Sequence, residues 1–99
     1  MAKSFQLRVV TAAGTVLDTR VLYCSLQTPE GSLGVLADHA PMLCALREGK
    51  LRFQIEDESE GILTHSSGVD SVRDNVLTLL VDDAKVTINP QKEDGAPSR

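Results

Sequence analysis

Hydrophobic and polar residues alternate in short runs along this chain, and polar or glycine-containing breaks separate the runs. The clearest alternation covers residues 51–56 (LRFQIE), and a second covers residues 5–9 (FQLRV). A period of two places every second side chain on the same face, which is typical of a half-buried β-strand. No stretch long enough for a helix of about twelve residues carries apolar side chains at helical spacing. The pattern therefore favours β structure throughout.

Eight further short strands are predicted between breaks rich in Gly, Ser, Asp and Asn. They cover residues 15–18, 21–27, 33–36, 42–46, 62–66, 69–72, 76–81 and 85–88. Many short strands with turns at regular intervals are typical of a sandwich or barrel. We therefore predict an all-β domain over residues 1–88, a two-sheet β-sandwich of about ten strands. Residues 89–99 offer no side chains to bury and are expected to form a flexible polar tail.

The stretch from Pro29 to Leu46 concentrates the most distinctive local chemistry. Residues 28–31 (TPEG) are typical of a turn, because proline presets φ at the second position and glycine suits the fourth. Residues 38–41 (DHAP) form a polar corner between two apolar runs, and Pro41 favours extended geometry at the residue before it. Residues 47–50 (REGK) then indicate a hairpin-type link. This arrangement favours a contact surface over a catalytic pocket.

The predicted strand 21–27 is apolar on both sides for part of its length. Strict alternation puts Leu22, Cys24 and Leu26 on one face and Val21 with Tyr23 on the other. A strand that is apolar on both faces is either central in the fold or part of an exposed contact surface.

Composition narrows the possible partners. The chain has 99 residues, a net charge of −4 and 41% hydrophobic residues, which suits one soluble domain. Ten basic residues scattered among fourteen acidic ones supply no cationic face for nucleic acid. No apolar window reaches the ~20 residues of a membrane helix, and no apolar segment follows the N-terminus as a secretory signal requires.

Cys24 and Cys44 are the only cysteines, and both lie in apolar runs. In a chain without a secretory signal, buried thiols are the expected state, although a disulfide would form if the two strands were neighbours. A metal site would need His39 and His65 as further ligands, and their spacing matches no metal motif. We expect no metal and no cofactor.

The sequence offers no positive case for catalysis. Asp82 and Asp83 are adjacent on a predicted strand end and point to opposite faces, so they cannot easily share a proton. Asp38 and His39 could join a serine in a triad, but no spacing guarantees that geometry. The glycines at 31 and 34 match neither a phosphate-binding loop nor a dinucleotide fingerprint. No small-molecule substrate is expected.

Residues 30–41 (EGSLGVLADHAP) resemble a run that epsilon subunits of F-type ATP synthases carry early in their N-terminal domain. In that family the run reads Glu-Gly, a glycine three positions later, two apolar residues, two variable residues, and then His followed by Ala or Met and Pro. The similarity extends to an opening strand, a turn with its strand, a Ser-Gly-Gly segment and a closing strand. Their counterparts here are residues 5–10, 47–52, 66–68 and 75–84. The resemblance covers residues 4–88.

The resemblance implies a ten-stranded β-sandwich and a role without chemistry of its own. It implies a central-stalk subunit that links the gamma subunit to the membrane ring of c subunits and couples proton or sodium flow to ATP synthesis. Such a subunit is peripheral, on the cytoplasmic face of the bacterial cell membrane. By position, Glu30, Gly31 and Ser32 would face the ring. His39, Ala40 and Pro41 would contact gamma, as would Val21 and Tyr23 if their shared face is an interface.

Three departures from the family pattern bear on this interpretation. Ser32 stands where many relatives have an acid, and Asp70 stands where an apolar residue is usual. Most relatives also continue into an inhibitory two-helix hairpin, which we expect this chain to lack because it ends at Arg99. The alternative hypothesis is a free-standing β-sandwich protein-binding module derived from the same family.

Overall fold

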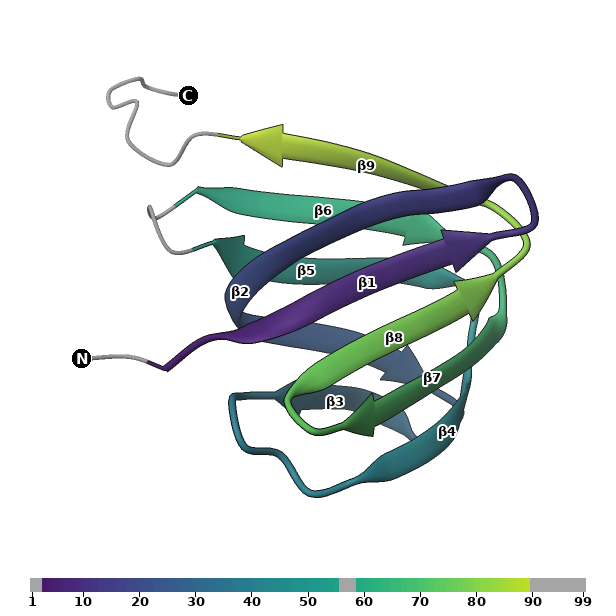
Figure 1. The fold of residues 1–99 in the computed structure, drawn as a ribbon. Helices are drawn as coiled ribbons and strands as arrows, with labels where there is room; N and C mark the ends of the chain where they lie inside the picture. Colours follow the sequence, from purple (N-terminus) through teal and green to yellow (C-terminus); the bar gives the residue numbers. More distant parts are fainter. Residues whose placement is uncertain (1–2, 56–58, 90–99) are drawn as a thin grey trace.

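A computed structural model describes residues 3–55 and 59–89, and within those ranges the chain forms nine β-strands and no helix (Figure 1). The strands are β1 (Phe5–Thr11), β2 (Gly14–Thr28), β3 (Gly31–Val35), β4 (Met42–Leu46), β5 (Gly49–Ile55), β6 (Glu60–His65), β7 (Gly68–Arg73), β8 (Val76–Val81) and β9 (Ala84–Asn89). The predicted all-β class is confirmed.

The strands form two packed layers that share β2 (Figure 1). One layer has the order β4-β7-β8-β1 and ends with the first half of β2, and only β1 and β8 are parallel neighbours. In the other layer the second half of β2 lies between β3 and β5, followed by β6 and β9. The two predicted sheets are thus one hydrogen-bonded sheet folded into a sandwich.

The strand count differs from the prediction because residues 15–18 and 21–27 belong to a single strand. The polar residues between them, Thr19 and Arg20, stay in the ladder opposite Leu7 and Gln6 of β1. A ladder is held by backbone N–H and C=O groups, which polar residues supply as well as apolar ones, so polar residues need not end a strand.

The predicted faces of β2 need correction at Val21. Val21 pairs with Ile55 and Tyr23 pairs with Gln54, so two steps along β2 match one step along β5. This bulge at Leu22 reverses the alternation. Val21 is therefore fully buried while Tyr23 is 41% exposed, and the two do not share a face.

The predicted hairpin-type link at residues 47–50 is also wrong. β4 pairs with β7, whereas β5 pairs with β2 and β6, so the link crosses from one layer to the other. Residues 49 and 50 already belong to β5. The Arg47 N–H donates to the Gln27 carbonyl at 3.1 Å and fastens the crossing to β2.

The core is built mainly from branched aliphatic residues facing inward from both layers. Its members are Phe5, Leu7, Val9, Val21, Cys24, Leu26, Val35, Leu46, Leu51, Phe53, Leu63, Val72, Leu77, Leu79 and Val81. Both phenylalanines are buried, and the ring of Phe53 covers Gly61 on the neighbouring strand. Cys24 and Cys44 are free thiols, and Cys24 is buried as predicted, whereas Cys44 is only half-buried.

The predicted tail overlaps the last strand at one position, since β9 extends to Asn89. The remainder of the predicted tail, residues 90–99, lies outside the described residues, as does the part of the acidic turn at residues 56–58. Among the described residues no helix is long and apolar enough to cross a membrane.

Candidate partner-binding surfaces

The corner at residues 36–41 leads from β3 in one layer to β4 in the other. Asp38 has a φ of 64°, a left-handed conformation that aspartate tolerates better than most residues. The His39 N–H donates to the Leu36 carbonyl at 3.3 Å, and His39 Nδ1 lies 2.7 Å from the Ala40 carbonyl. That distance assigns the proton to Nδ1. Local hydrogen bonds therefore hold the corner in shape.

The turn between β7 and β8 fastens this corner from the side. Asp74 and Asn75 both have positive φ, as a two-residue type I′ hairpin requires. The Asp38 N–H donates to Asn75 Oδ1 at 2.6 Å, and Asn75 Nδ2 donates to Asp38 Oδ1 at 3.1 Å. Lys3 adds an ion pair to Asp38. The hydrogen bond from Lys3, and to a smaller extent the one from Asn75, lowers the pKa of the Asp38 carboxyl below its ordinary value.

The predicted turn at residues 28–31 is confirmed at the other end of β3. Thr28 Oγ1 accepts the Glu30 N–H at 3.2 Å and donates to the Gly31 carbonyl at 2.8 Å. Gly31 has a φ of 124°, which a larger residue rarely adopts. Glu30, Gly31 and Ser32 are all exposed, and Gln27 Nε2 donates to Ser32 Oγ at 3.3 Å.

The two predicted contact sets are thus separated along β3. Glu30, Gly31 and Ser32 lie at its start, and His39, Ala40 and Pro41 follow its end. Tyr23 lies elsewhere, on the outer side of the second layer, where its ring covers Gly34. Val21 has no exposed surface and cannot contribute to a contact there.

An apolar row crosses the outer side of the first layer, where a sheet facing water normally carries polar residues. Ala45 of β4 lies opposite Val69 of β7, Val69 lies opposite Leu80 of β8, and Leu80 lies opposite Val10 of β1. Leu43, two residues before Ala45 on β4, is 77% exposed, and Leu80 is 51% exposed. We refer to these five residues as the outer apolar face. It begins two residues after Pro41 and is continuous with the corner along the chain.

Sequence reasoning missed the outer apolar face, although residues 76–81 carried a signal. This segment is apolar at nearly every position, and the structure buries Leu77, Leu79 and Val81 while leaving Leu80 outside. A segment apolar on both faces indicates either a second layer or an uncovered surface, and the sequence alone does not distinguish them.

Asp70 lies on the inner side of the same layer and is fully buried. Neither carboxylate oxygen has a hydrogen-bond partner among the described residues. Burial raises the pKa of this carboxyl to about 6, and His39 partly offsets that effect. Asp70 departs from the family pattern, in which an apolar residue is usual, but nothing in the sequence indicates that it points inward.

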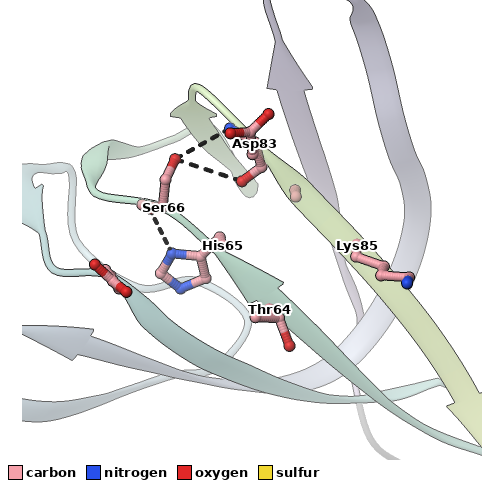
Figure 2. Close-up of a pocket in the computed structure, with 7 residues that line it drawn as sticks. Thr64, His65, Ser66, Asp83 and Lys85 are labelled. Atoms are coloured by element: carbon pink, nitrogen blue, oxygen red, sulfur yellow. Dashed lines mark hydrogen bonds between the residues drawn. The ribbon is translucent and has the colours of Figure 1, made fainter.

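A hollow of about 350 Å³ lies at the end of β6, beside the start of β9 (Figure 2). Ser66 Oγ accepts the N–H groups of Asp82 and Asp83, each at 3.0 Å, and His65 Nδ1 lies 2.8 Å from the Ser66 carbonyl. The hydroxyl thus stabilises a turn, and the imidazole faces a backbone oxygen. This arrangement supplies no nucleophile–base pair. In residues 3–55 and 59–89, no three His, Cys, Asp or Glu side chains are grouped to hold a metal ion.

Comparison with known families gives a match over nearly the whole described chain. Residues 4–87 match the model of the ATP synthase delta/epsilon chain β-sandwich domain. The chain belongs to this family. The resemblance seen in residues 30–41 is thereby confirmed.

Individual epsilon chains support the family membership. An ATP synthase epsilon chain from Desulfitobacterium hafniense is 36% identical over 85 residues, covering 86% of this chain and 64% of the relative. A chloroplastic ATP synthase epsilon chain from Mesostigma viride is 31% identical over 91 residues, covering 92% of this chain and 68% of the relative. This epsilon-type domain therefore spans roughly two thirds of the length of these relatives.

Solved structures show the same fold. A chain in the cryo-EM structure of the Euglena gracilis mitochondrial ATP synthase OSCP/F1/c-ring assembly superposes with a TM-score of 0.78 at 24% identity. It covers 93% of this epsilon-type domain, which in turn covers 56% of that chain. A chain from the central stalk and c-ring of the Tetrahymena thermophila mitochondrial enzyme gives 0.68 at 18% identity, with 85% and 67% covered.

Proposed function

We propose that this chain is a non-catalytic central-stalk subunit of an ATP synthase. In this role it links the gamma subunit to the c-subunit ring and helps couple proton or sodium translocation to ATP synthesis. It is peripheral to the membrane, on the cytoplasmic face of a bacterial cell. The observation that carries the proposal is the outer apolar face, continuous with a fastened corner, on the sandwich domain of the epsilon family.

The gamma contact is assigned to the corner and the outer apolar face together. Exposed apolar side chains in a row across neighbouring strands favour burial against a protein partner, because about 25 cal/mol is gained per Å² of apolar surface removed from water. His39, Ala40 and Pro41 border this face through the start of β4. The fastening of Asp38 reduces the loss of conformational entropy when the corner is bound.

The ring contact is assigned to Glu30, Gly31 and Ser32. These residues are exposed at the turn that opens β3, whereas the corner follows the other end of that strand. β3 would then act as a rigid spacer between the two contacts. With a serine at position 32, Glu30 is left as the only ionised side chain of this set.

Tyr23 is a separate candidate contact, since it lies on the second layer and apart from the outer apolar face. Its ring is 41% exposed and lies over Gly34. For Tyr23 to contact gamma, that subunit would have to extend around the edge of the second layer, which β3 forms.

Co-expression with the gamma subunit of the same organism tests the proposal. We expect the two chains to elute together in size-exclusion chromatography at micromolar concentration, and to be recovered with the c ring from native membranes. If the chain elutes apart from gamma and is absent from the purified membrane complex, the free-standing binding module is the better description.

A further inference from the structure

Asp70 is the buried ionisable group that the proposed contacts leave unexplained. It lies in the middle of β7, between Cys44 of β4 and Leu79 of β8, with its side chain in the space between the layers. Both oxygens lack a hydrogen-bond partner among the described residues. An ionised carboxylate in such a place is strongly disfavoured relative to the neutral acid.

The titratable groups around Asp70 do little to stabilise its charge. Cys44 faces it from β4 and Cys24 from β2 in the other layer, and burial raises the pKa of both thiols, which keeps them neutral. His39, from the corner, is the group that favours the ionised carboxylate. The opposite position on β8 is apolar. The burial effect is larger than that of His39 and raises the pKa of Asp70 to about 6.

β4, the strand beside Asp70, lies at the edge of this layer, and we expect it to open more easily than its neighbours. β4 is five residues long and lies at the end of the strand order, hydrogen-bonded to β7 alone within the described part of the chain. Its inner side carries Cys44 toward Asp70, and its outer side carries Leu43 and Ala45 of the outer apolar face. Opening of β4 would let water reach the carboxylate and would disrupt that face at the same time.

We propose that Asp70 is a proton-binding switch beneath the outer apolar face, closing edge strand β4 when protonated and releasing it when ionised. Because linkage is reciprocal, a partner that binds the closed β4 strengthens proton binding at Asp70, and acidification strengthens partner binding. The identity of that partner as gamma rests on the proposed function. The coupling between Asp70 and β4 does not.

Amide hydrogen exchange measured by NMR at pH 5.5 and 7.5 tests the coupling in the isolated chain. After correction for intrinsic exchange rates, the β4 amides should be less protected than those of β1 and β8 at both pH values, because they exchange through local opening of the edge strand. Their protection should fall about fourfold at the higher pH, as expected for a carboxyl whose pKa is about 6 in the closed state and 3.8 in the open state. In Asp70→Asn and in the apolar Asp70→Leu, β4 protection should not depend on pH. Asp82→Asn, which neutralises an exposed aspartate, should behave as the parent chain does.

Several outcomes would overturn the proposal. One is the same pH dependence of β4 protection in Asp70→Leu as in the parent chain. Another is β4 amides that exchange as slowly as those of β1 and β8, because β4 would then open only when the whole domain unfolds. If a variant fails to fold, ¹³C titration of the Asp70 carboxyl in the parent chain decides. A midpoint near 6 supports the switch, and a midpoint near the ordinary value of 3.8 contradicts it.

Measuring gamma binding at both pH values distinguishes failure of the switch from failure of the proposed function. If gamma binds more tightly at pH 5.5 than at 7.5 in the parent chain and the difference disappears in Asp70→Leu, both proposals stand. If gamma binds with the same pH dependence in both chains, the switch is wrong and the stalk role stands. If gamma does not bind at either pH while β4 protection still follows Asp70, the stalk role is wrong and the switch stands.

Discussion

Asn75 and Asp38 form a reciprocal pair of hydrogen bonds across 37 positions of sequence. The Asp38 amide donates to the Asn75 side-chain oxygen at 2.6 Å, and the Asn75 side-chain amide donates to the Asp38 carboxylate at 3.1 Å. Both residues have positive φ. The turn that joins β7 to β8 therefore holds the corner from which His39 projects, and two left-handed residues determine its position.

The Asn75–Asp38 pair can be removed without straining the turn. Asn75→Gly keeps a residue that adopts a φ of 62° freely and deletes both side-chain bonds, whereas Asn75→Ala adds backbone strain. We expect the pKa of Asp38 to rise in Asn75→Gly, since the Asn75 hydrogen bond lowers it. NMR titration of the Asp38 carboxyl measures this. Asp74→Gly is the matched control at the neighbouring turn position, and an equal rise there would contradict the assignment.

The outer apolar face should contribute to binding and little to stability. Leu43→Glu and Leu80→Glu place charges in the proposed contact, so we expect gamma binding to weaken at least tenfold, about 1.4 kcal/mol. Because both side chains are largely exposed, the free energy of unfolding should change by about 0.5 kcal/mol or less. Ile88→Glu, at an apolar site of 46% exposure on the other layer, is the control. Equal weakening by Ile88→Glu would show that the effect is not local.

Val21 and Tyr23 should respond to substitution in opposite ways. Val21→Ala removes buried methyl groups, and we expect it to lower the free energy of unfolding by about 2 kcal/mol. Tyr23→Glu changes an exposed residue, so stability should stay within about 0.5 kcal/mol. Urea unfolding of the two variants decides between the bulged register and simple alternation. A larger loss in Tyr23→Glu than in Val21→Ala would contradict the bulge at Leu22.

The fold could be predicted from alternation, whereas the details of its faces could not. Residues 5–9 and 51–55 each have one polar and one apolar face, and the structure turns the apolar one inward. At Leu22 the extra residue reverses every later face in β2, and alternation within one strand carries no information about where a partner strand skips a position. The long-range pairing of β4 with β7 was likewise invisible to local turn signals.

The candidate surfaces were predictable only where local chemistry specifies a turn. Residues 28–31 carry proline and glycine at positions that define one, and the structure confirms it. The outer apolar face depends on which strands lie side by side, because Ala45, Val69 and Leu80 are far apart in sequence. Burial of Asp70 depends on the same pairing. These properties belong to the arrangement of strands and not to any one segment.

Stability should depend on pH through Asp70. Its folded-state pKa of about 6 lies above the ordinary 3.8, so the folded chain holds this proton more tightly than the unfolded chain. The stabilisation is complete below about pH 4 and is lost as the pH rises through about 6. We expect unfolding to become easier by on the order of 2 kcal/mol across that window in the parent chain relative to Asp70→Leu. Urea unfolding of both chains at several pH values measures the difference, and parallel curves would contradict it.

The contact between Phe53 and Gly61 makes the sharpest prediction about the core. These residues face each other across β5 and β6, and a Cβ added at Gly61 would lie 2.2 Å from Phe53 Cζ. The ring is buried and has little room to move, so Gly61→Ala should lower the free energy of unfolding by about 2 kcal/mol. Gly34→Ala is the matched control, because its added Cβ would lie 3.4 Å from the exposed ring of Tyr23.

If the ring of Phe53 causes the loss, Gly61→Ala should be much less costly in a Phe53→Leu background, and a double-mutant cycle by urea unfolding measures that coupling. Strictly additive effects would mean that the cost of Gly61→Ala arises from the backbone of β6 and not from the ring above it.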